Sequence, residues 1–455
     1  MEFRLRQLRR LTRFLVDKHD DLLKALEADF KSHFEAKSEL LSVQSEAVKA
    51  IDNLAGWMKP STVKTPLAFW MDSCQMRSEP RGPVLIIAPW NYPLDLLLTP
   101  LIGAIAAGCT AVLKPAEQTR NTVAFLEEFL FEYLDPECFQ IVTGGASETT
   151  VLLDWPNWGL IFFTGSGRVG RIVHAKAAKN LIPTILELGG KSPCIVAGVP
   201  SDLDLQTVAK RIIYGKLFNA GQTCVAPDYL LLTNGELLQP LKEQLLLAIK
   251  TFYGDEPSQS ADYSRIVDTE QWDRLSKLLK DGEKAEQVIQ VGRSDREARF
   301  FAPTLVIKPD LETGIMTEEI FGPILVLVVV SSLDEAIAFI RARPKPLAMY
   351  LFSSDSSVVE RVTRSISCGG CTINDTMMHV FSGCFPLGGV GPSGMGAYRG
   401  RQSFETFSHQ KPFMWCSLKG EMMNDQTRNP PLSDTKMSIT GRAIFSAPKV
   451  HHLAD

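Results

Sequence analysis

Cys224 stands in a setting that suits chemistry better than packing. It occupies the stretch FNAGQTCVAP, residues 218 to 227, behind small polar residues and one glycine. A cysteine that only packs usually has apolar neighbours, because its thiol behaves as a small hydrophobe. A nucleophilic cysteine needs access for its substrate together with backbone donors, a helix N-terminus or a positive neighbour. A polar, glycine-containing turn is compatible with that role, and a structural cysteine is the alternative interpretation.

Glu187, in LELGGKSP (186–193), is a candidate general base. Two glycines follow Leu188, so the chain can turn sharply there and let another group approach the carboxylate. A carboxylate in a tight, partly buried place can act as a base, because burial raises its pKa towards the working pH. The alternative interpretation is a glutamate at the end of a strand with no chemical role.

The stretch GSGRVG (165–170) has the spelling of a phosphate-binding turn. It follows the apolar run LIFF and precedes the helix-like RIVHAKAAK, so a strand, a glycine-rich turn and a helix succeed one another. The same fingerprint would place an acidic residue, here Glu187, on a ribose hydroxyl. The glycines after Glu187 favour the base instead, so the phosphate role is predicted for the turn alone.

Short apolar runs and helix-length segments alternate around these residues. VLIIAP, TAVLKP, CFQIVTG and LIFFTG each end in Pro or Gly, which predicts an α/β fold with a parallel sheet of a nucleotide-binding type. From Gly189 a second α/β region follows. Residues 1–56 are expected to form two amphipathic helices, residues 60–80 a hairpin or connector, and the tail 411–455 an extended arm. The uncharged run 96–113 is interrupted by Pro and Gly, so a buried helix and strand are expected there.

The composition excludes several classes of partner. At 455 residues the chain exceeds a single core, so two domains are expected. A net charge of −4 gives no basic surface for nucleic acid. Nine scattered cysteines argue against a disulfide framework, and no targeting peptide or transmembrane segment is recognised, which favours the cytoplasm. Cys368 and Cys371 form a C-x-x-C without further ligands at zinc spacing, so no metal site is predicted.

Seven motifs taken together resemble the aldehyde dehydrogenase superfamily. They are APWNYP (88–93), VLKPAE (112–117), FTGSGRVG (163–170), LELGGKSP (186–193), FNAGQTCVAPDY (218–229), EEIFGP (318–323) and GGVGPSGMG (388–396). They occur in the order of the family and span about 300 residues. The spelling GQTCVAPDY, the motif GGVGPSGMG and SFETFSH (403–409) are similar to the class 3 branch, whose members are dimers that oxidise medium-chain, long-chain or aromatic aldehydes.

The resemblance implies a role for each matching residue. Cys224 would be the nucleophile, Asn91 with the Cys224 backbone N–H would form the oxyanion hole, and Glu187 would activate the water that hydrolyses the thioester. Residues expected at the NAD or NADP cofactor are Lys114 and Glu117 at the adenosine ribose, Gly165, Ser166 and Gly170 at the pyrophosphate, and Glu319 and Phe321 at the nicotinamide ribose. Glu117 should repel a 2′-phosphate, so both cofactors are expected, with NAD preferred.

The implied architecture has two Rossmann-like domains and a small bridging element. Residues 1–188 would bind NAD(P), with the bridging hairpin near 60–80. Residues 189–393 would carry the nucleophile, and 394–455 would return and form a dimerisation arm in a homodimer. The expected reaction is oxidation of an aldehyde to the carboxylic acid. Two alternatives stay open at this point, a cofactor-independent cysteine hydrolase or esterase and a catalytically silent member of the family.

Overall fold

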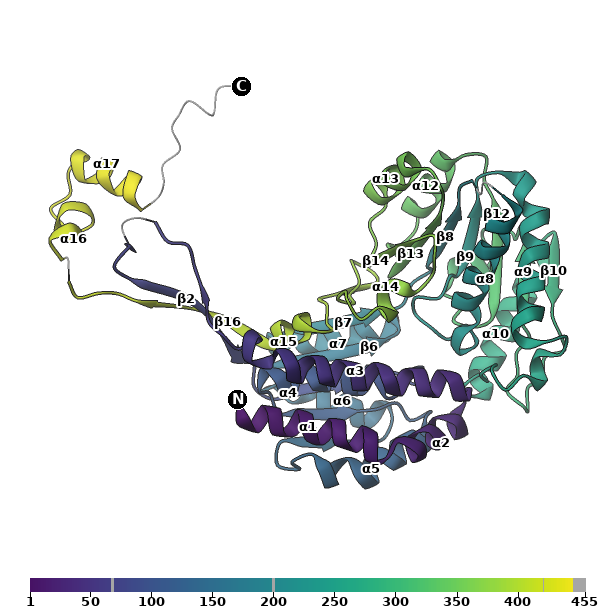
Figure 1. The fold of residues 1–455 in the computed structure, drawn as a ribbon, viewed down its shortest axis with the longest axis horizontal. Helices are drawn as coiled ribbons and strands as arrows, with labels where there is room; N and C mark the ends of the chain where they lie inside the picture. The colour runs from purple at the N-terminus through teal and green to yellow at the C-terminus, as the bar shows by residue number, and fades with distance from the viewer. Residues whose placement is uncertain (67–68, 199–200, 420, 445–455) are drawn as a thin grey trace. The chain divides into compact units, whose positions relative to one another are not determined.

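The computed structural model describes residues 1–66, 69–198, 201–419 and 421–444. The chain forms two compact units (Figure 1). The first consists of Met1–Leu54 with Arg81–Phe407, and the second of Ala55–Pro80 with Ser408–Asp455. Within the described ranges, no helix combines the length and the apolar character that crossing a membrane requires.

A six-stranded sheet in the first unit carries the predicted run of buried parallel strands. Its members are β3 (Val84–Ile87), β4 (Ala111–Lys114), β5 (Phe139–Ile141), β6 (Leu160–Gly165), β7 (Thr184–Leu188) and β15 (Gly394–Met395). The order is β15-β7-β6-β3-β4-β5, and only β15 runs antiparallel to its neighbour. The helices between the strands are α4 (Asp95–Ala107), α5 (Arg120–Tyr133), α6 (Ala146–Asp154) and α7 (Gly167–Lys179).

A seven-stranded sheet in the same unit carries the second α/β region. Its strands are β8 (Pro193–Val196), β9 (Tyr229–Leu232), β10 (Gln287–Gln290), β11 (Thr304–Ile307), β12 (Ile324–Val329), β13 (Ala348–Phe352) and β14 (Gly370–Ile373). The order is β10-β11-β12-β9-β8-β13-β14, with β10 alone antiparallel. Its helices are α8 (Asp202–Leu217), α9 (Leu238–Tyr253), α10 (Thr269–Asp281), α11 (Gly314–Thr317), α12 (Leu333–Arg341), α13 (Ser356–Ser365) and α14 (Met378–Phe381), whereas α15 (Arg401–Thr406) follows β15 and packs on α4. The α/β fold with parallel sheets is confirmed, whereas the domain boundaries at 188 and 393 stay predictions.

The N-terminal segment forms three helices, so the expectation of two was wrong. They are α1 (Glu2–Asp17), α2 (His19–Asp29) and α3 (His33–Trp57). Lys18, whose ψ of 17° is not helical, separates α1 from α2. The break is one residue long, so it leaves the spacing of the apolar residues almost unchanged. The uncharged run 96–113 covers α4 except for its first residue, Asp95, and β4 except for its last residue, Lys114, as expected. All thirteen residues of α4 are buried.

The second unit is built on a three-stranded antiparallel sheet. It contains β1 (Ser61–Thr62), β2 (Ser73–Pro80) and β16 (Ser408–Trp415), with β2 in the centre. The expected hairpin over 60–80 is present, and the tail begins as the extended strand β16. The tail also forms α16 (Glu421–Thr427) and α17 (Asp434–Ala443), which were not expected. The signal for α17 is local, because the Ser433 hydroxyl accepts a hydrogen bond from the Lys436 N–H.

Candidate active site

Cys224 follows a tight turn at the end of α8. The turn, Phe218–Gly221, has left-handed backbone at Asn219 (φ 57) and at Ala220 (φ 50). Such a conformation costs free energy in a residue with a side chain, and it persists only where the surroundings enforce it. Gly221 (φ 75) is required for a second reason, because a Cβ there would lie 2.2 Å from the Gly322 carbonyl oxygen. The turn therefore packs directly against the EIFGP segment.

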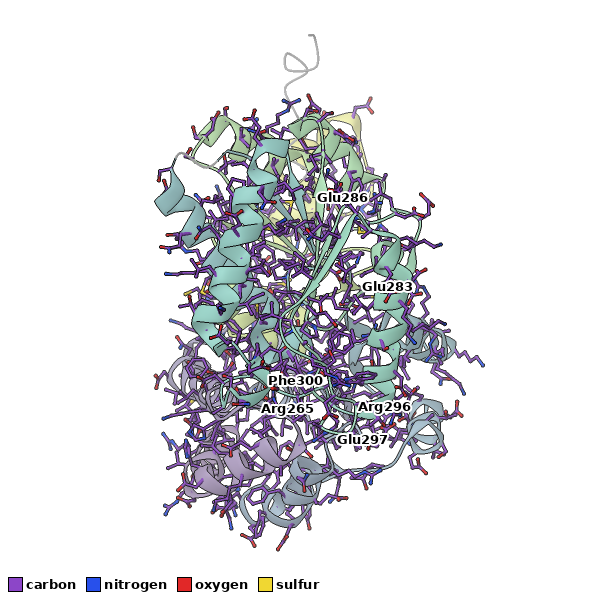
Figure 2. The ribbon with its side chains drawn as sticks, turned by 90° about the vertical axis from the view of Figure 1, so that its right-hand side faces the viewer. Arg265, Glu283, Glu286, Arg296, Glu297 and Phe300 are labelled. Atoms are coloured by element: carbon purple, nitrogen blue, oxygen red, sulfur yellow. The ribbon has the colours of Figure 1, made fainter. Side chains whose placement is uncertain are left out.

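The two residues before Cys224 are anchored on opposite sides. The Gln222 side chain donates to the Arg265 carbonyl at 2.9 Å and accepts from the Val267 N–H at 3.0 Å. Figure 2 labels Arg265 beside Phe300, whose ring centroid lies 5.4 Å from the Arg265 guanidinium carbon. The Thr223 hydroxyl hydrogen-bonds to the Tyr92 hydroxyl at 2.6 Å. These contacts fix the backbone that carries the thiol.

The Cys224 thiol is partly exposed and faces negative groups. Burial raises its pKa to about 12, and the negative charges of Glu319 and Glu187 add to that shift. The Cys224 backbone N–H and the Arg399 guanidinium act in the opposite direction. The thiol is therefore protonated at neutral pH, and its use as a nucleophile requires a group that takes the proton.

Asn91 lies between β3 and α4 and is buried against the Cys224 turn. Its side-chain nitrogen donates to the Gln222 carbonyl at 3.1 Å, two residues before Cys224. An amide nitrogen carries two hydrogens, so this bond leaves the second hydrogen for another acceptor. The Asn91 backbone carbonyl oxygen accepts from the Lys31 ammonium at 3.0 Å and from the Asn219 side-chain amide at 2.9 Å.

Glu187 occupies β7, paired with Thr164 of β6 and Gly394 of β15. The side chain is buried, and neither carboxylate oxygen has a hydrogen-bond partner among the described residues. Burial raises the pKa of Glu187 well above its ordinary value, and the Arg399 guanidinium opposes that shift. Buried polar atoms are normally hydrogen-bonded, so this carboxyl group is poised for a partner that the protein itself does not supply.

The residues expected at the adenosine and pyrophosphate lie at the ends of β4 and β6, the two strands that flank β3. Lys114 ends β4, and burial lowers the pKa of its ammonium while Glu117 and Glu148 oppose that shift. The GSGRVG turn connects β6 to α7 as predicted, and Ser166 caps α7 by accepting from the Val169 N–H at 3.4 Å. A Cβ on Gly170 would lie 2.6 Å from the Leu188 side chain, so glycine permits the close packing of α7 on the sheet.

Glu319 lies between α11 and β12, against the glycines that follow Glu187. A Cβ on Gly189 would lie 2.1 Å from a Glu319 carboxylate oxygen, so the glycine is what admits this side chain. Burial raises the pKa of Glu319 to about 7, and the negative charge of Asp228 adds to it. The Gly190 N–H, Arg274 and Lys191 oppose the shift.

The segment around Glu319 is fixed from both sides. Arg274 donates to the carbonyl oxygens of Glu319 at 3.3 Å and Ile320 at 2.6 Å. The Asp228 carboxylate accepts from the Ile320 N–H at 3.1 Å. Phe321 has φ 49, and its ring lies edge-on to Trp90 with the centroids 5.4 Å apart.

A cavity of about 1120 Å³ lies beside the turn that carries Cys224. Phe218, the first residue of that turn, lines it, and so does Arg399, whose charge acts on Cys224 and Glu187. Arg399 is held in the wall by Asp95, with 2.6 Å between the guanidinium and the carboxylate. The apolar residues of the lining are Leu41, Tyr214, Phe218, Met378, Phe381 and Phe385.

Several residues that shape the site were not found from the sequence. They are Lys31, Glu35 and Glu39 near the N-terminus, and Asp95, Asp228, Arg274 and Arg399 further along. A signal existed for two of them, because Glu35 and Glu39 lie on the face of α3 that also buries Ala36, Leu40 and Val43. No local pattern distinguished Arg274 or Arg399 from other surface arginines.

The fold and the site together define a class of protein. Two largely parallel sheets carry a strand, glycine-rich turn and helix of dinucleotide-binding type, and a cysteine faces buried carboxylates at their loops. This is the arrangement of an α/β enzyme that combines a thiol with a nucleotide cofactor. Residues 1–413 match the model of the aldehyde dehydrogenase family, and the chain belongs to that family.

Individual relatives agree with this membership. Aldehyde dehydrogenase family 3 member B1 of Homo sapiens is 48% identical over 440 residues, covering 96% of this chain and 92% of the relative. Aldehyde dehydrogenase family 3 member A2 of Pongo abelii is 43% identical over 439 residues, covering 96% and 88%. The solved structure described as the substrate-bound state of Staphylococcus aureus AldH has a TM-score of 0.92 and 41% identity, covering 97% of this chain and 94% of that one.

Membership of this family establishes the class of reaction. The chain is an NAD(P)-dependent oxidoreductase that acts on aldehydes, and the resemblance found in the seven motifs is confirmed. The alternatives of a cofactor-independent hydrolase and a silent family member are not favoured.

Proposed function

We propose that Cys224 attacks the aldehyde carbon, that Asn91 stabilises the resulting oxyanion, and that Glu187 activates the water that releases the acid. The observation that carries this proposal is the buried Glu187 carboxyl group, which has no hydrogen-bond partner among the described residues. Its negative charge also contributes to the raised pKa of Cys224. Burial raises the pKa of this carboxyl group well above its ordinary value, so its carboxylate is a stronger base than that of an exposed glutamate.

The steps follow from the groups in place. The Cys224 thiol gives its proton to water as the sulfur bonds to the carbonyl carbon, and the carbonyl oxygen becomes an oxyanion beside the free Asn91 amide hydrogen. When the oxyanion returns to a carbonyl group, a hydride leaves that carbon, and a bound nicotinamide would accept it. The chain is then left as a thioester, and Glu187 takes a proton from water as the water oxygen attacks the thioester carbon. The carbon–sulfur bond breaks, the proton held by Glu187 passes to the sulfur, and the products are a carboxylic acid and the free thiol.

The residues expected at the cofactor fit that group chemically. Gly189 leaves room for the Glu319 carboxylate, which can accept from ribose hydroxyls, and the start of α7 offers N–H groups to a pyrophosphate. Lys114 and Glu117 would hold the adenosine ribose, Gly165, Ser166 and Gly170 the pyrophosphate, and Phe321 with Glu319 the nicotinamide ribose. We propose that both NAD and NADP are used, with NAD preferred because Glu117 repels a 2′-phosphate.

The substrate class follows from the cavity beside the Cys224 turn. Apolar and aromatic side chains line it together with serines and charged groups such as Glu46 and Lys49, and we propose that the apolar part receives a medium-chain, long-chain or aromatic aldehyde. Because the glutamate base is present, hydrolysis of the thioester is proposed as the release step. We further propose a cytoplasmic homodimer that uses the second unit for assembly.

A pre-steady-state experiment separates the roles of the two principal residues. Reduced nicotinamide is followed by absorbance after mixing enzyme, NAD and a panel of short, long-chain and aromatic aldehydes. Cys224→Ser should abolish turnover. Glu187→Gln should keep the burst of the first turnover and slow the steady state by about 10²-fold to 10⁴-fold, because only release of the acid needs the base.

A surface glutamate provides the matched control. Glu297→Gln removes a charge from a side chain that is 87% exposed, and its burst and steady-state rates should equal those of the wild type. A Glu187→Gln enzyme with an unchanged steady-state rate would refute the assignment of the base. Activity that persists without any nicotinamide cofactor would instead favour the hydrolase.

A further inference from the structure

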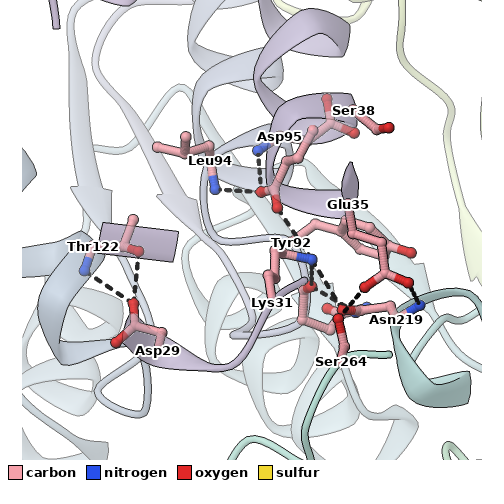
Figure 3. A network of polar contacts seen from close by, with 12 residues as sticks. Asp29, Lys31, Glu35, Ser38, Tyr92, Leu94, Asp95, Thr122, Asn219 and Ser264 are labelled. Atoms are coloured by element: carbon pink, nitrogen blue, oxygen red, sulfur yellow. Dashed lines mark hydrogen bonds and ion pairs between the residues drawn. The ribbon is translucent and has the colours of Figure 1, made fainter. Parts of the chain in front are cut away.

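A buried cation lies between the two loops that carry Asn91 and Cys224. Lys31 belongs to the short connection between α2 and α3, and its side chain is wholly buried. Its ammonium group donates to the Asn91 carbonyl and to the Asn219 side-chain oxygen, both at 3.0 Å. Figure 3 shows this ammonium at the centre of a network of polar contacts. One side chain thus bonds to the β3–α4 loop and to the turn before Cys224.

Glu35 holds the same turn from the other side. Its carboxylate accepts from the Asn219 N–H at 2.6 Å and from the Ser264 hydroxyl. Asn219 therefore has its backbone N–H bound by Glu35 and its side-chain oxygen bound by Lys31. These bonds fall on the residue with φ 57, where the backbone needs external support.

Glu39 holds the loop that carries Asn91. One of its carboxylate oxygens accepts from the Leu94 N–H at 2.7 Å and from the Asp95 N–H at 3.0 Å. Its other oxygen forms an ion pair with the Lys31 ammonium at 3.2 Å. Burial raises the pKa of both Glu35 and Glu39, and the positive charge of Lys31 opposes the shift in each. A buried charge without a partner would cost free energy, so Lys31, Glu35 and Glu39 depend on one another for their charges.

We propose that Lys31 is a positioning residue, which holds the Asn91 amide at the Cys224 turn in the geometry that receives the oxyanion. This inference rests on the proposed roles of Cys224 and Asn91. Lys31 touches no reacting atom, and it acts through the Asn91 carbonyl and Asn219. Donors that stabilise a developing charge must be placed before the reaction, and a small displacement of them is expensive in rate.

The test is a cycle of Lys31→Met and Asn91→Ala, measured on the burst of reduced nicotinamide. Lys31→Met should slow the burst by on the order of 10-fold to 100-fold, and Asn91→Ala by about 10²-fold to 10³-fold. The double variant should be no slower than Asn91→Ala within about twofold, because the two changes remove the same stabilisation. The dissociation constant of NAD and the KM for the aldehyde should stay within about twofold of the wild type.

Asp29 offers a matched control two residues away. It is also buried, but its carboxylate accepts from Asn121 and Thr122 at the start of α5 and from neither active-site loop. Asp29→Asn should lower the melting temperature and leave the burst rate unchanged. If Lys31→Met does not fold, Lys31→Gln keeps a polar side chain in the same place and is measured instead, with the same expected direction.

The outcomes separate this inference from the proposed function. If Asn91→Ala leaves the burst unchanged, the oxyanion role of Asn91 fails, and the positioning role of Lys31 fails with it. If Asn91→Ala slows the burst while Lys31→Met does not, the positioning role alone is wrong. Effects that multiply fully in the double variant would also overturn it, because Lys31 would then act independently of Asn91.

Discussion

At the scale of residues, the site combines the Cys224 thiol with two carboxyl groups, the buried Glu187 and the half-buried Glu319. The pKa of Cys224 is raised to about 12, in contrast to reactive cysteines whose thiolate is stabilised in the resting protein. Burial is the largest cause of that shift, and the negative charges of Glu319 and Glu187 add to it. Arg399 is the positive charge that acts on both Cys224 and Glu187. The proton of the thiol must therefore be removed as the aldehyde is attacked.

We expect Glu319 to make cofactor binding depend on pH near neutrality. Its pKa of about 7 means that the carboxylate is ionised above pH 7 and protonated below it. If it accepts hydrogen bonds from the nicotinamide ribose, the ionised form binds NAD better. The dissociation constant of NAD should therefore rise about tenfold from pH 8 to pH 6, as expected for a single linked proton. Fluorescence titration with NAD across this range measures it.

The matching variant removes the titrating group without changing its shape. Glu319→Gln should bind NAD more weakly at pH 8 and show a flat profile between pH 6 and pH 8. The charged groups that set the wild-type pKa are Asp228, Arg274 and Lys191, and all three are kept in this variant. Parallel profiles for the two proteins would show that another group controls the binding.

The candidate residues could be predicted only where the chain keeps them within a recognisable motif. Cys224, Glu187 and Asn91 each lie in a stretch whose spelling identifies a family. Lys31 was missed because its partners Asn91 and Asn219 lie 60 and 188 positions away, and nothing near it in the chain indicates either of them. The direction of the Cys224 pKa shift was also inaccessible, because it comes first from burial and then from Glu319 and Glu187, and the fold alone sets both.

At the scale of elements, strands and helices were predicted best where burial is continuous. The apolar runs that became β3, β4 and β6 are buried almost throughout, so their composition alone identifies them, whereas the run that became β5 is buried only at Phe139. β15 has only two residues and no pattern, yet it pairs with β7 at Glu187. The break between α1 and α2 was missed for the opposite reason, because apolar spacing continues across it.

The contact between α4 and α15 depends on Gly103. A Cβ at this position would lie 2.7 Å from the Ser403 Cβ and 3.1 Å from the Phe407 ring. Gly103→Val should therefore lower the free energy of unfolding by about 1–3 kcal/mol through overpacking. The shift in apparent melting temperature, recorded at one scan rate, measures this effect.

Gly56 is the appropriate control for that substitution. It also lies in a helix, α3, but a Cβ there would meet nothing within 4 Å. Gly56→Ala should leave the melting temperature unchanged or raise it slightly, because alanine is the better helix former. A Gly103→Val protein that melts with the wild type would show that α4 and α15 can separate without cost.

At the scale of the whole molecule, the second unit carries apolar side chains that its own fold does not cover. Trp415 is 70% exposed, Leu418 100% and Met422 73%. Single exposed apolar residues are ordinary, but large side chains gathered on a small unit are typical of an interface. These exposed side chains are available for contact with another protein surface. The proposed homodimer supplies that surface from a second copy of the same unit.

Charge placed on this surface should separate the copies. Leu418→Glu combined with Met422→Glu buries two carboxylates in the proposed interface, and light scattering after size-exclusion chromatography should change from the mass of a dimer to that of a monomer. Val151→Glu is the control, because Val151 is 73% exposed on α6 of the first unit and should leave the mass unchanged. A wild-type protein that elutes as a monomer at micromolar concentration would refute the homodimer. A dimer that survives the double substitution would place the interface elsewhere, since two unpaired charges cannot be accommodated in a dry contact without weakening it.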